Sequence, residues 1–470
     1  MGFQTSGGER FLDRTVCLQA IYSRDVRFDG RFFAGATTTG LYCRNICPVP
    51  FAKPGHLVLF ACAGTAESAG FRPCKRCRPE AAPGTPAWLG TSAVVSRAYR
   101  LILEGALNQG NIEDLAGRMG LGSRHLRRLF VQHLGTSPLK IATTHRVHLA
   151  RKLIEESPFS MTRIAFYSGF RSIREFNHAV VSSSGQSPSE LRRASRGSCM
   201  PPQAGCLELR LPYRTPFDWR SLIAFLKQRA VEGVEVVTET SYQRTIKIGG
   251  VPGFFSAFHE EAESRLHIRL QVDNYQGLAQ TVERIRRLFD LHADPVQIAS
   301  HLSRDPDLRP LLNLRPGLRV PGVWDGFETA VLAVLGQRLT RRAPAKVVRR
   351  FVRLFGTPVA TPVAGLNMLF PSPETIAAAD LSQAGIGEAR AATLRRLADA
   401  IVRRQFEFSA PTLERAVSQL RSVCGVDEST ANYIAMRAFG EPDAFPASAP
   451  RSIPETWRPW RAYAAMHLTA

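Results

Sequence analysis

The sequence predicts a multidomain α+β protein built from four consecutive parts. Three observations lead to this expectation. Four cysteines gather between residues 40 and 80, a helical unit occurs twice between residues 91 and 193, and strand-like alternation appears between residues 206 and 290 before the chain becomes helical again. A chain of 470 residues is long enough for three or four domains of about 100–200 residues each.

The charge balance indicates the kind of partner. Lys and Arg number 61 against 40 Asp and Glu, so the net charge is +21, and the hydrophobic fraction of 44% is ordinary for folded domains. Such an excess indicates nucleic acid or an anionic membrane surface. The sequence has no apolar run of about 18 residues and no stretch that is basic on one face only, so we expect nucleic acid and no membrane. The N-terminus lacks the apolar core of a signal peptide, which predicts a cytoplasmic protein.

The first part, residues 1–82, carries the four cysteines Cys43, Cys47, Cys74 and Cys77 in a C-x3-C and a C-x2-C pair. Four thiolates suit one tetrahedral zinc ion, which binds sulfur at about 2.3 Å and folds modules that lack a large core. The alternative is a set of buried thiols or two disulfides, but both pairs lie in basic loops punctuated by proline. The flanking cations suggest a nearby phosphate: Arg44, Arg72, Lys75, Arg76 and Arg78. The other five cysteines are scattered and are expected to be structural.

The second part, residues 91–194, follows a linker at 80–88 and contains an internal repeat. Residues 111–141 and 161–191 both predict a short helix, a glycine turn, a serine cap, a longer helix and a final G-x-S-P. Leu115-Ala116 and Ile164-Ala165 should begin the packed faces, Gly120 and Gly169 should form the turns, and Ser123 and Ser172 should cap the longer helices. A break at 192–205, rich in Ser, Gly, Pro and Arg, is expected to be mobile.

This spacing is that of a helix-turn-helix, and two copies predict two recognition helices that enter successive major grooves of double-stranded DNA. An isolated pattern of this kind is often only the corner of a helical bundle, but the duplication with the same G-x-S-P ending favours DNA binding. The pattern is similar to the DNA-binding domain of the AraC family of transcription regulators. The candidate DNA contacts in the two longer helices are Ser123, Arg124, Arg127, Arg128, Arg171, Ser172 and Arg174.

The cysteine module followed by such a domain resembles the N-terminal half of the Ada adaptive-response proteins, on the segments TTTGLYCR (37–44) and GFRPCKRC (70–77). The resemblance implies that a zinc-bound cysteine takes a methyl group from a DNA methylphosphotriester and that the protein then activates repair genes, with RNA polymerase as a partner. By position the acceptor corresponds to Cys43, which spacing alone does not distinguish from the other three. A zinc-stabilised transcription factor without methyl transfer is the non-enzymatic alternative. The chain has no P-C-H-R motif, so repair of O6-methylguanine is not expected.

The third and fourth parts span residues 206–290 and 291–470. The former alternates like strands at LELRLPY, EVVTETSYQRTIKIGG and LHIRLQV, with helices at 217–231 and 281–291, and the latter is helical. The segments FDLHADP (289–295), LRVPGVWDGFETAVLAVLGQ (318–337), TANYIAMRAFGEPDAFPAS (430–448) and WRPWRAYAAMHL (457–468) resemble AlkA-type 3-methyladenine DNA glycosylases. That resemblance implies a small α+β domain followed by a helix–hairpin–helix glycosylase domain, and together the two halves resemble fused regulator–glycosylase repair proteins.

Several positions depart from the glycosylase pattern. The family hairpin reads roughly L-P-G-[IV]-G-x-W-T-A, and here Asp427 stands at the second glycine and Ser429 at a pocket tryptophan. An aspartate there places a negative charge at a DNA phosphate contact and tolerates positive φ poorly. Ala449 stands where the catalytic aspartate follows F-P-A-S, and Thr469 stands where a further tryptophan is usual.

The helix that normally follows this aspartate is missing, by roughly a dozen residues, so the fourth part is expected to be a truncated, degenerate glycosylase domain. A working glycosylase, and an error in this segment of the sequence, are the alternatives. The nearby carboxylates Glu441 and Asp443 are weaker substitutes for the missing acid, and Trp324 and Gln337 are expected to pack rather than to catalyse.

Overall fold

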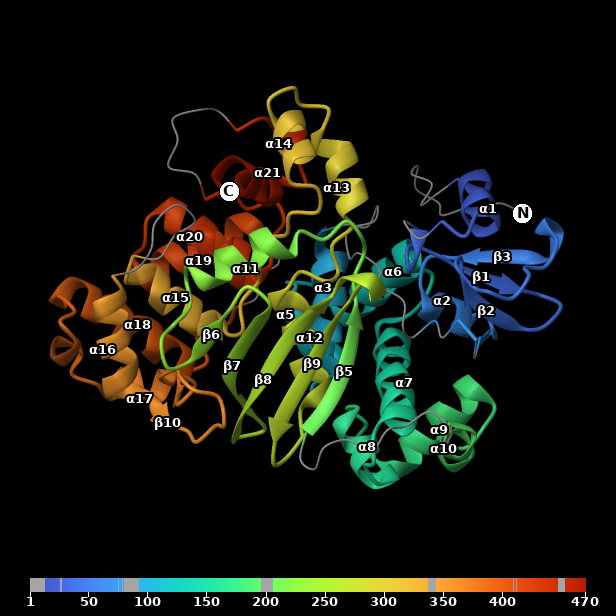
Figure 1. The fold of residues 1–470 in the computed structure, drawn as a ribbon, viewed down its shortest axis with the longest axis horizontal. Coiled ribbons are helices and arrows are strands. Elements are labelled where there is room, and N and C mark those ends of the chain that lie inside the picture. Colours follow the sequence, from blue (N-terminus) through green and yellow to red (C-terminus); the bar gives the residue numbers. More distant parts are fainter. Residues whose placement is uncertain are drawn as a thin grey trace. The chain divides into compact units, whose positions relative to one another are not determined.

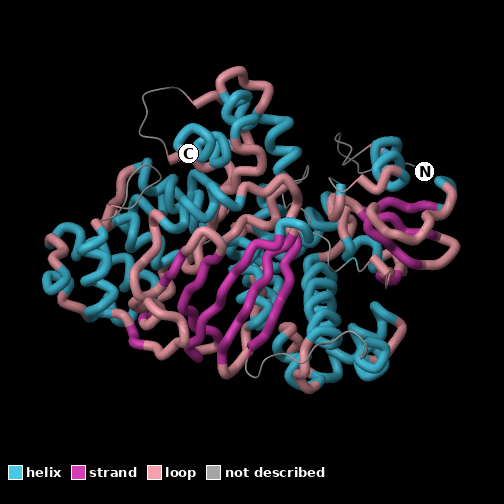
Figure 2. Tube along the Cα trace, viewed as in Figure 1, coloured by secondary structure: helices cyan, strands magenta, loops and turns pink. Residues whose placement is uncertain are grey.

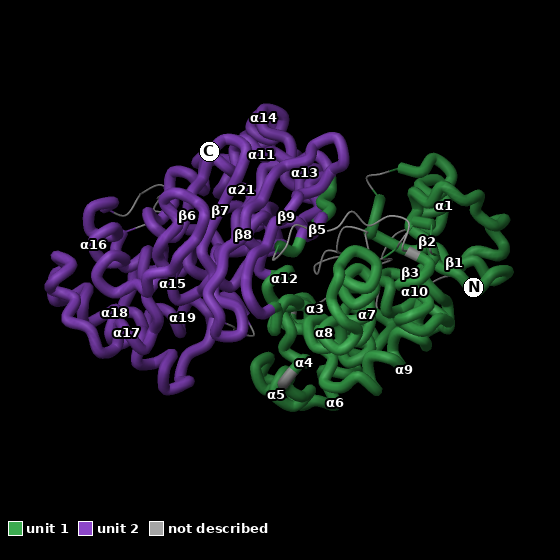
Figure 3. The backbone as a smooth tube through the Cα atoms, turned by 60° about the horizontal axis from the view of Figure 1, so that its bottom comes forward, with its two compact units in different colours: residues 1–207, 211–214, 275–283 green, residues 208–210, 215–274, 284–470 purple. Residues whose placement is uncertain are grey.

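The computed structural model describes residues 13–25, 28–74, 76–77, 79, 93–195, 206–336, 344–408, 410, 412–446 and 453–470. Lys75, Arg78, Gln337 and Ala449 lie outside the described residues, as do most of the predicted linkers. The chain forms two compact units (Figure 3). Unit 1 comprises residues 1–207, 211–214 and 275–283, and unit 2 comprises residues 208–210, 215–274 and 284–470.

Unit 1 begins with a small sheet of strand order β3-β1-β2-β4. Its strands are β1 (Phe33–Ala36), β2 (Leu41–Arg44), β3 (Leu57–Phe60) and β4 (Arg72–Pro73), and only the β2–β4 pair is parallel. Helix α1 (Arg14–Tyr22) contributes Cys17, Ala20 and Ile21 to a core that also holds Phe32 and Leu59 of the sheet region. Helix α2 (Ala63–Ser68) follows β3. The short strands place both cysteine pairs at neighbouring strand ends.

Residues 93–195 of unit 1 are helical (Figure 1). Its helices are α3 (Ala93–Leu103), α4 (Ala106–Gln109), α5 (Ile112–Arg118), α6 (Ser123–Leu134), α7 (Pro138–Glu156), α8 (Met161–Tyr167), α9 (Ile173–Ser184) and α10 (Pro188–Ser195). The pairs α5–α6 and α8–α9 are the two predicted repeats, and α7 joins them. As predicted, Leu115, Ala116, Ile164 and Ala165 are buried, and the turn glycines Gly120 and Gly169 have φ values of 68° and 92° that favour glycine.

Two expectations about this region were wrong. Ser172 caps α9 by accepting from the backbone N–H of Glu175, but Ser123 lies inside α6, whose cap is Gly122 without a side-chain bond. The helix starts one residue earlier in the first repeat because glycine readily takes the cap position itself. Residues 192–195, assigned to a mobile break, complete α10, where Arg192 donates to the carbonyl oxygens of Ile154 and Phe159 at 3.2 and 2.7 Å.

The predicted α+β region forms a five-stranded sheet of order β5-β9-β8-β7-β6 (Figure 2). The strands are β5 (Cys206–Pro212), β6 (Glu235–Val237), β7 (Ser241–Ile248), β8 (Val251–Glu260) and β9 (Arg265–Val272), with helices α11 (Trp219–Lys227) and α12 (Leu278–Leu288). Strand β8 was not predicted, because Pro252 and Gly253 interrupt its alternation. It nevertheless pairs along its length with β7 and β9.

The remainder of unit 2 is helical and encloses one large core that includes Phe327, Phe351, Leu394, Leu420 and Phe439. Its helices are α13 (Pro295–Leu302), α14 (Leu308–Leu314), α15 (Gly326–Val334), α16 (Ala345–Phe355), α17 (Pro373–Ala378), α18 (Glu388–Val402), α19 (Leu413–Cys424), α20 (Glu428–Ile434) and α21 (Arg461–Thr469), with a short hairpin of β10 (Thr357–Pro358) and β11 (Met368–Leu369). Within the described residues, none of the helices has both the length and the apolar character to span a membrane.

Candidate metal centre and neighbouring surfaces

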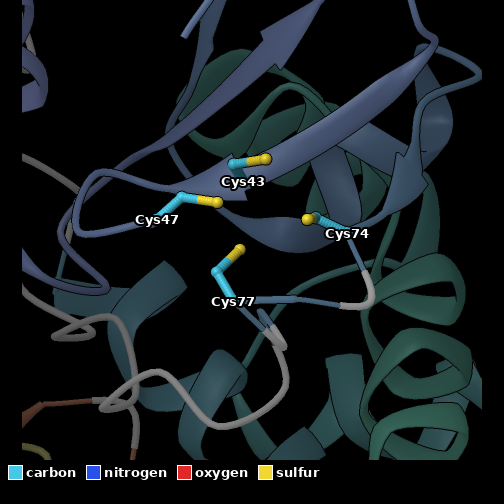
Figure 4. Close-up of side chains that lie close together, drawn as sticks. All are labelled: Cys43, Cys47, Cys74 and Cys77. Carbon is cyan, nitrogen blue, oxygen red and sulfur yellow. The ribbon is translucent and has the colours of Figure 1, made fainter. Parts of the chain in front are cut away.

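The four predicted cysteines converge on one point (Figure 4). Cys43 lies on β2, Cys47 follows in the next turn, Cys74 comes directly after β4, and Cys77 follows three residues later. The four Sγ atoms lie within 4.8 Å of one another. A tetrahedral ion with metal–sulfur bonds of about 2.3 Å places its sulfurs about 3.8 Å apart, so the cluster fits one zinc ion. Among the described cysteines none is in a disulfide.

The pKa values of the clustered thiols indicate that a cation would stabilise their deprotonated forms. Hydrogen bonds with Cys74 and Cys77, together with burial, raise the pKa of Cys43. A hydrogen bond from Cys43 lowers the pKa of Cys74. Without a metal ion, deprotonation of Cys74 is therefore favoured while that of Cys43 is disfavoured. Four sulfurs this close carry mutually repelling charges when deprotonated, and a divalent cation removes that penalty.

Two further residues brace this cluster. The guanidinium of Arg44 forms a two-point ion pair with the carboxylate of Asp29 and donates from Nη1 to the carbonyl oxygen of Cys77 at 3.2 Å. The backbone N–H of Arg44 points to the Sγ of Cys77 at 3.4 Å. The side chains of Arg44 and Asp29 are only 15% and 8% exposed. Sequence reasoning placed Arg44 at DNA and missed Asp29, which lies far from the cysteine pairs along the chain.

A cavity of about 650 Å³ opens beside Cys43. Its lining includes Cys43, Cys74, Arg72 and Arg76, and it also includes residues 184–186 at the end of α9. Cys43 is the only partly exposed member of the cluster, since Cys47, Cys74 and Cys77 are buried. Cys43 therefore lies at the cavity together with two arginines, Arg72 and Arg76, whose guanidinium groups can bind anions.

The two longer helices of the repeats present different cation patterns. On α6, Arg124, Arg127 and Arg128 are exposed, and Arg127 lies 3.7 Å from Glu113 in an exposed pair. On the second repeat Arg174 is exposed. Arg171 instead donates to the carbonyl oxygens of Asn108 and Gly110 at 2.9 and 2.6 Å, so its guanidinium is held by α4 and the residue that ends it.

A buried arginine of α7 joins α4 to the second repeat. Arg146 on α7 donates to Oδ1 of Asn108 at 2.9 Å and to Oε1 of Glu175 at 3.1 Å, and also to the carbonyl oxygen of Leu107. Glu175 lies in the first turn of α9. This polar lock thus connects α4, α7 and the start of α9, and the hydrophobic periodicity of the sequence did not predict it.

The departures in the glycosylase-like domain have local explanations. Asp427 has φ −66°, so the expected backbone strain is absent: the positive φ of this hairpin belongs to Gly425 at 61°. The Asp427 carboxylate caps α20 by accepting from the backbone N–H of Thr430 at 2.7 Å, so it occupies a helix terminus that favours anions.

The side chains at the other altered positions also form hydrogen bonds within the domain. Ser429 donates to the carbonyl oxygen of Pro446, and Thr469 donates to that of Ala465. Asp443 is held by Arg461 in a two-point ion pair with distances of 2.7 and 2.8 Å, which makes it a poor substitute for a catalytic carboxylate. Trp324 is 7% exposed and its ring lies against Phe255, as expected of a packing residue.

Comparison with known proteins gives three family matches along the chain. The family described as metal binding domain of Ada matches residues 16–80, a helix-turn-helix domain family matches residues 115–194, and the family described as AlkA N-terminal domain matches residues 208–325. These matches confirm the predicted combination of a metal module, a helix-turn-helix domain and a glycosylase-like part.

Whole proteins give the same picture. A probable bifunctional transcriptional activator/DNA repair enzyme AlkA of Mycobacterium tuberculosis is 38% identical over 96% of this chain and 95% of its own length. DNA-3-methyladenine glycosylase 2 of Escherichia coli is 33% identical over 55% of this chain and 95% of its own. The Escherichia coli bifunctional transcriptional activator/DNA repair enzyme Ada is 32% identical over 32% of this chain and 41% of its own.

Proposed function

This chain belongs to the family of bifunctional transcriptional activator/DNA repair enzymes that join an Ada-type metal module to an AlkA-type domain, and from this premise we propose a DNA alkylation-damage response protein. Cys43, held with three other cysteines on one zinc ion, accepts a methyl group from a methylphosphotriester of double-stranded DNA. The helix-turn-helix repeats then bind a promoter and activate transcription by RNA polymerase. The proposed domains are residues 1–82, 91–194, 206–290 and 291–470.

The position of Cys43 is the observation that carries the proposal. Cys43 is the partly exposed residue of the four and lines the cavity with Arg72 and Arg76. Zinc, when bound, keeps the sulfurs deprotonated at neutral pH. The Cys43 Sγ attacks the methyl carbon, the S–C bond forms as the C–O bond breaks, and the phosphate leaves as an ordinary diester anion. The thioether is stable, so each molecule reacts once.

A change of charge links this reaction to DNA binding. Zinc with four thiolates has a formal charge of 2 − 4 = −2, and a thioether in place of one thiolate changes it to 2 − 3 = −1. One unit charge about 4 Å from a phosphate contributes about 1 kcal/mol in water and about 4 kcal/mol at an effective dielectric constant of 20. Methylation is therefore expected to strengthen DNA binding by a factor between about five and several hundred.

We also propose that the glycosylase-like domain is catalytically impaired. Ala449 has no carboxylate with which to stabilise the cationic sugar, and loss of a positioned acid–base group costs about 10²–10⁴ in rate. The Asp427 carboxylate at the N-terminus of α20 also opposes a DNA phosphate. Release of 3-methyladenine from alkylated DNA at the rate of an intact glycosylase would show instead that the protein is fully bifunctional.

A mass-shift experiment tests the methyl transfer. The zinc-loaded chain is incubated with methylphosphotriester DNA, and the peptide that contains Cys43 should gain one methyl group. Cys43→Ser should gain none, whereas Cys206→Ser, which removes a partly exposed thiol outside the cluster, should react like the wild type. A wild-type chain without mass gain favours a zinc-stabilised transcription factor that transfers no methyl group.

A further inference from the structure

Helix α2 connects the cysteine module to the helical part of unit 1 through a buried carboxylate. The side chain of Glu67 is 4% exposed. Its Oε1 accepts from the hydroxyl of Tyr42 at 3.0 Å, and its Oε2 accepts from the hydroxyl of Thr144 at 2.9 Å. His148 Nε2 lies 3.4 Å from Oε1, and Lys140 Nζ lies 3.8 Å from Oε2. We call these five residues the Glu67 hub.

On one side the hub reaches the metal cluster through Tyr42. This residue precedes Cys43 on β2, is fully buried, and accepts at its carbonyl oxygen from the backbone N–H of Cys74 at 3.0 Å. Two of the four metal ligands are therefore bonded directly to the residue whose hydroxyl binds Glu67. A shift of the β2 backbone at Cys43 moves this hydroxyl, because the two residues are consecutive on one strand.

On the other side the hub holds α7. Lys140, Thr144 and His148 are spaced by four residues, so they share one face of that helix. Burial raises the pKa of Glu67, but the interactions with His148, Lys140 and Thr144 together outweigh it and keep this pKa below its ordinary value, so Glu67 is an anion that faces the Lys140 ammonium of α7. Through Arg146, the same helix contacts Glu175 in the first turn of α9.

Helix α2 also contacts the end of the first recognition helix. The hydroxyl of Thr65 donates to the carbonyl oxygen of Leu134, the last residue of α6, at 2.7 Å, and Ser68 lies 2.7 Å from the hydroxyl of Thr136. The equivalent glycine caps of the two recognition helices, Gly135 and Gly185, both have φ 69°. Both are close to the module, since a Cβ added to Gly135 would meet Thr65 and one added to Gly185 would meet Arg72.

We propose that Tyr42 and Glu67 are positioning residues that transmit the state of the cysteine cluster to α7, and through it to both helix-turn-helix repeats. The proposal rests on the proposed function, in which Cys43 becomes methylated. It adds the contacts through which this methylation would reach the helices proposed to read DNA. Coupling of this kind requires an element that both ends contact, and the Glu67 hub is such an element.

Hydrogen exchange of α7 in the zinc-loaded full chain tests this route. Methyl iodide alkylates the Cys43 thiolate with release of iodide and without DNA, and peptide mapping confirms the site. In the wild type, methylation should change the exchange rates of amides in residues 138–156 by about tenfold, the equivalent of one charge-assisted hydrogen bond. In Tyr42→Phe, which removes only the hydroxyl, the change should fall below about threefold.

Three controls keep the result interpretable. Tyr22→Phe removes an exposed tyrosine hydroxyl of the same module, which bonds the carbonyl oxygen of Ala52, and should behave like the wild type. Thr144→Val removes one bond of the hub from the α7 side and should reduce the response without altering zinc content. If alkylation is incomplete, Cys43→Ser replaces it, because this variant also removes one thiolate charge. The exchange rates of α7 are then compared between the wild type and Cys43→Ser, and again between Tyr42→Phe and the double variant.

The outcomes separate the two proposals. A wild-type α7 that does not respond to methylation or to Cys43→Ser, or a Tyr42→Phe protein that responds as the wild type does, overturns the proposed route. Failure to take a methyl group from methylphosphotriester DNA, with a normal response to methyl iodide, refutes the proposed function and leaves the route intact.

Discussion

Replacing Arg44 by methionine tests the support of the metal centre. Arg44→Met keeps an unbranched side chain but removes the guanidinium that pairs with Asp29 and donates to the carbonyl oxygen of Cys77. The Asp29 side chain is 8% exposed, so its carboxylate would lose its partner in a buried site. Removal of one partner of a buried ion pair costs about 3–5 kcal/mol.

That cost should appear as weaker metal binding, because small metal modules couple folding to their ion. At about 1.4 kcal/mol for each factor of ten, a loss of about 3 kcal/mol lowers zinc affinity about 100-fold. The affinity is measured by competition between the full chain and a chromophoric zinc chelator of known affinity, followed by absorbance.

A control variant and a double variant show whether the loss of zinc affinity comes from the unpaired Asp29 carboxylate. Arg24→Met is the matched control, because Arg24 is exposed and donates to the carbonyl oxygen of Pro48 in the same module. It should bind zinc nearly as tightly as the wild type. Asp29→Asn in the Arg44→Met background removes the orphaned charge and should restore most of the affinity. Wild-type affinity in Arg44→Met, or no recovery in the double variant, would refute the reasoning.

Other predictions concern the rest of the chain. Arg146→Met should lower the free energy of unfolding of unit 1 by about 3 kcal/mol, because Glu175 and Asn108 lose a buried donor, and an unchanged urea midpoint would contradict this. Burial lowers the pKa of His467 from 6.5 to about 4, so the folded state resists protonation. Stability of unit 2 should therefore be complete above pH 6.5 and fall by up to about 3 kcal/mol towards pH 4, and denaturation of His467→Leu at each pH should give a flatter profile. Ala449→Asp alone should leave 3-methyladenine release far below that of an intact glycosylase, because Asp427 still opposes the DNA backbone; full activity in a base-release assay would disprove this.

The cysteine cluster could be predicted because its information is local. Metal-ligand spacing within each pair follows from the turn that carries it, and Cys43, Cys47, Cys74 and Cys77 do converge. The repeats were predictable for the same reason, since hydrophobic period and glycine turns recur within about 30 residues. The family resemblance, rather than spacing, singled out Cys43.

The contacts that brace these elements could not be predicted. The partner of Arg44 is Asp29, in the segment between α1 and β1, and a basic residue beside a cysteine pair has the same sequence pattern whether it meets that carboxylate or a phosphate. Arg171 illustrates the same ambiguity, because its backbone partners Asn108 and Gly110 lie about 60 residues away, on α4 and at its C-terminal cap. Side-chain direction, rather than residue type, decides between structural and DNA-binding arginines.

The Arg146 lock has a consequence for the arrangement of promoter sites. Because one buried guanidinium on α7 joins Asn108 of α4, the helix before the first repeat, to Glu175 at the start of α9, the second repeat cannot rotate relative to α4 without breaking it. DNA repeats its grooves about every 10.5 base pairs, so half a turn of inserted duplex places one half-site on the opposite side of the helix. If both repeats read DNA as proposed, a pair of readers fixed in this way is expected to respond to helical phase as well as to sequence, and to prefer promoters whose half-sites lie a set distance apart.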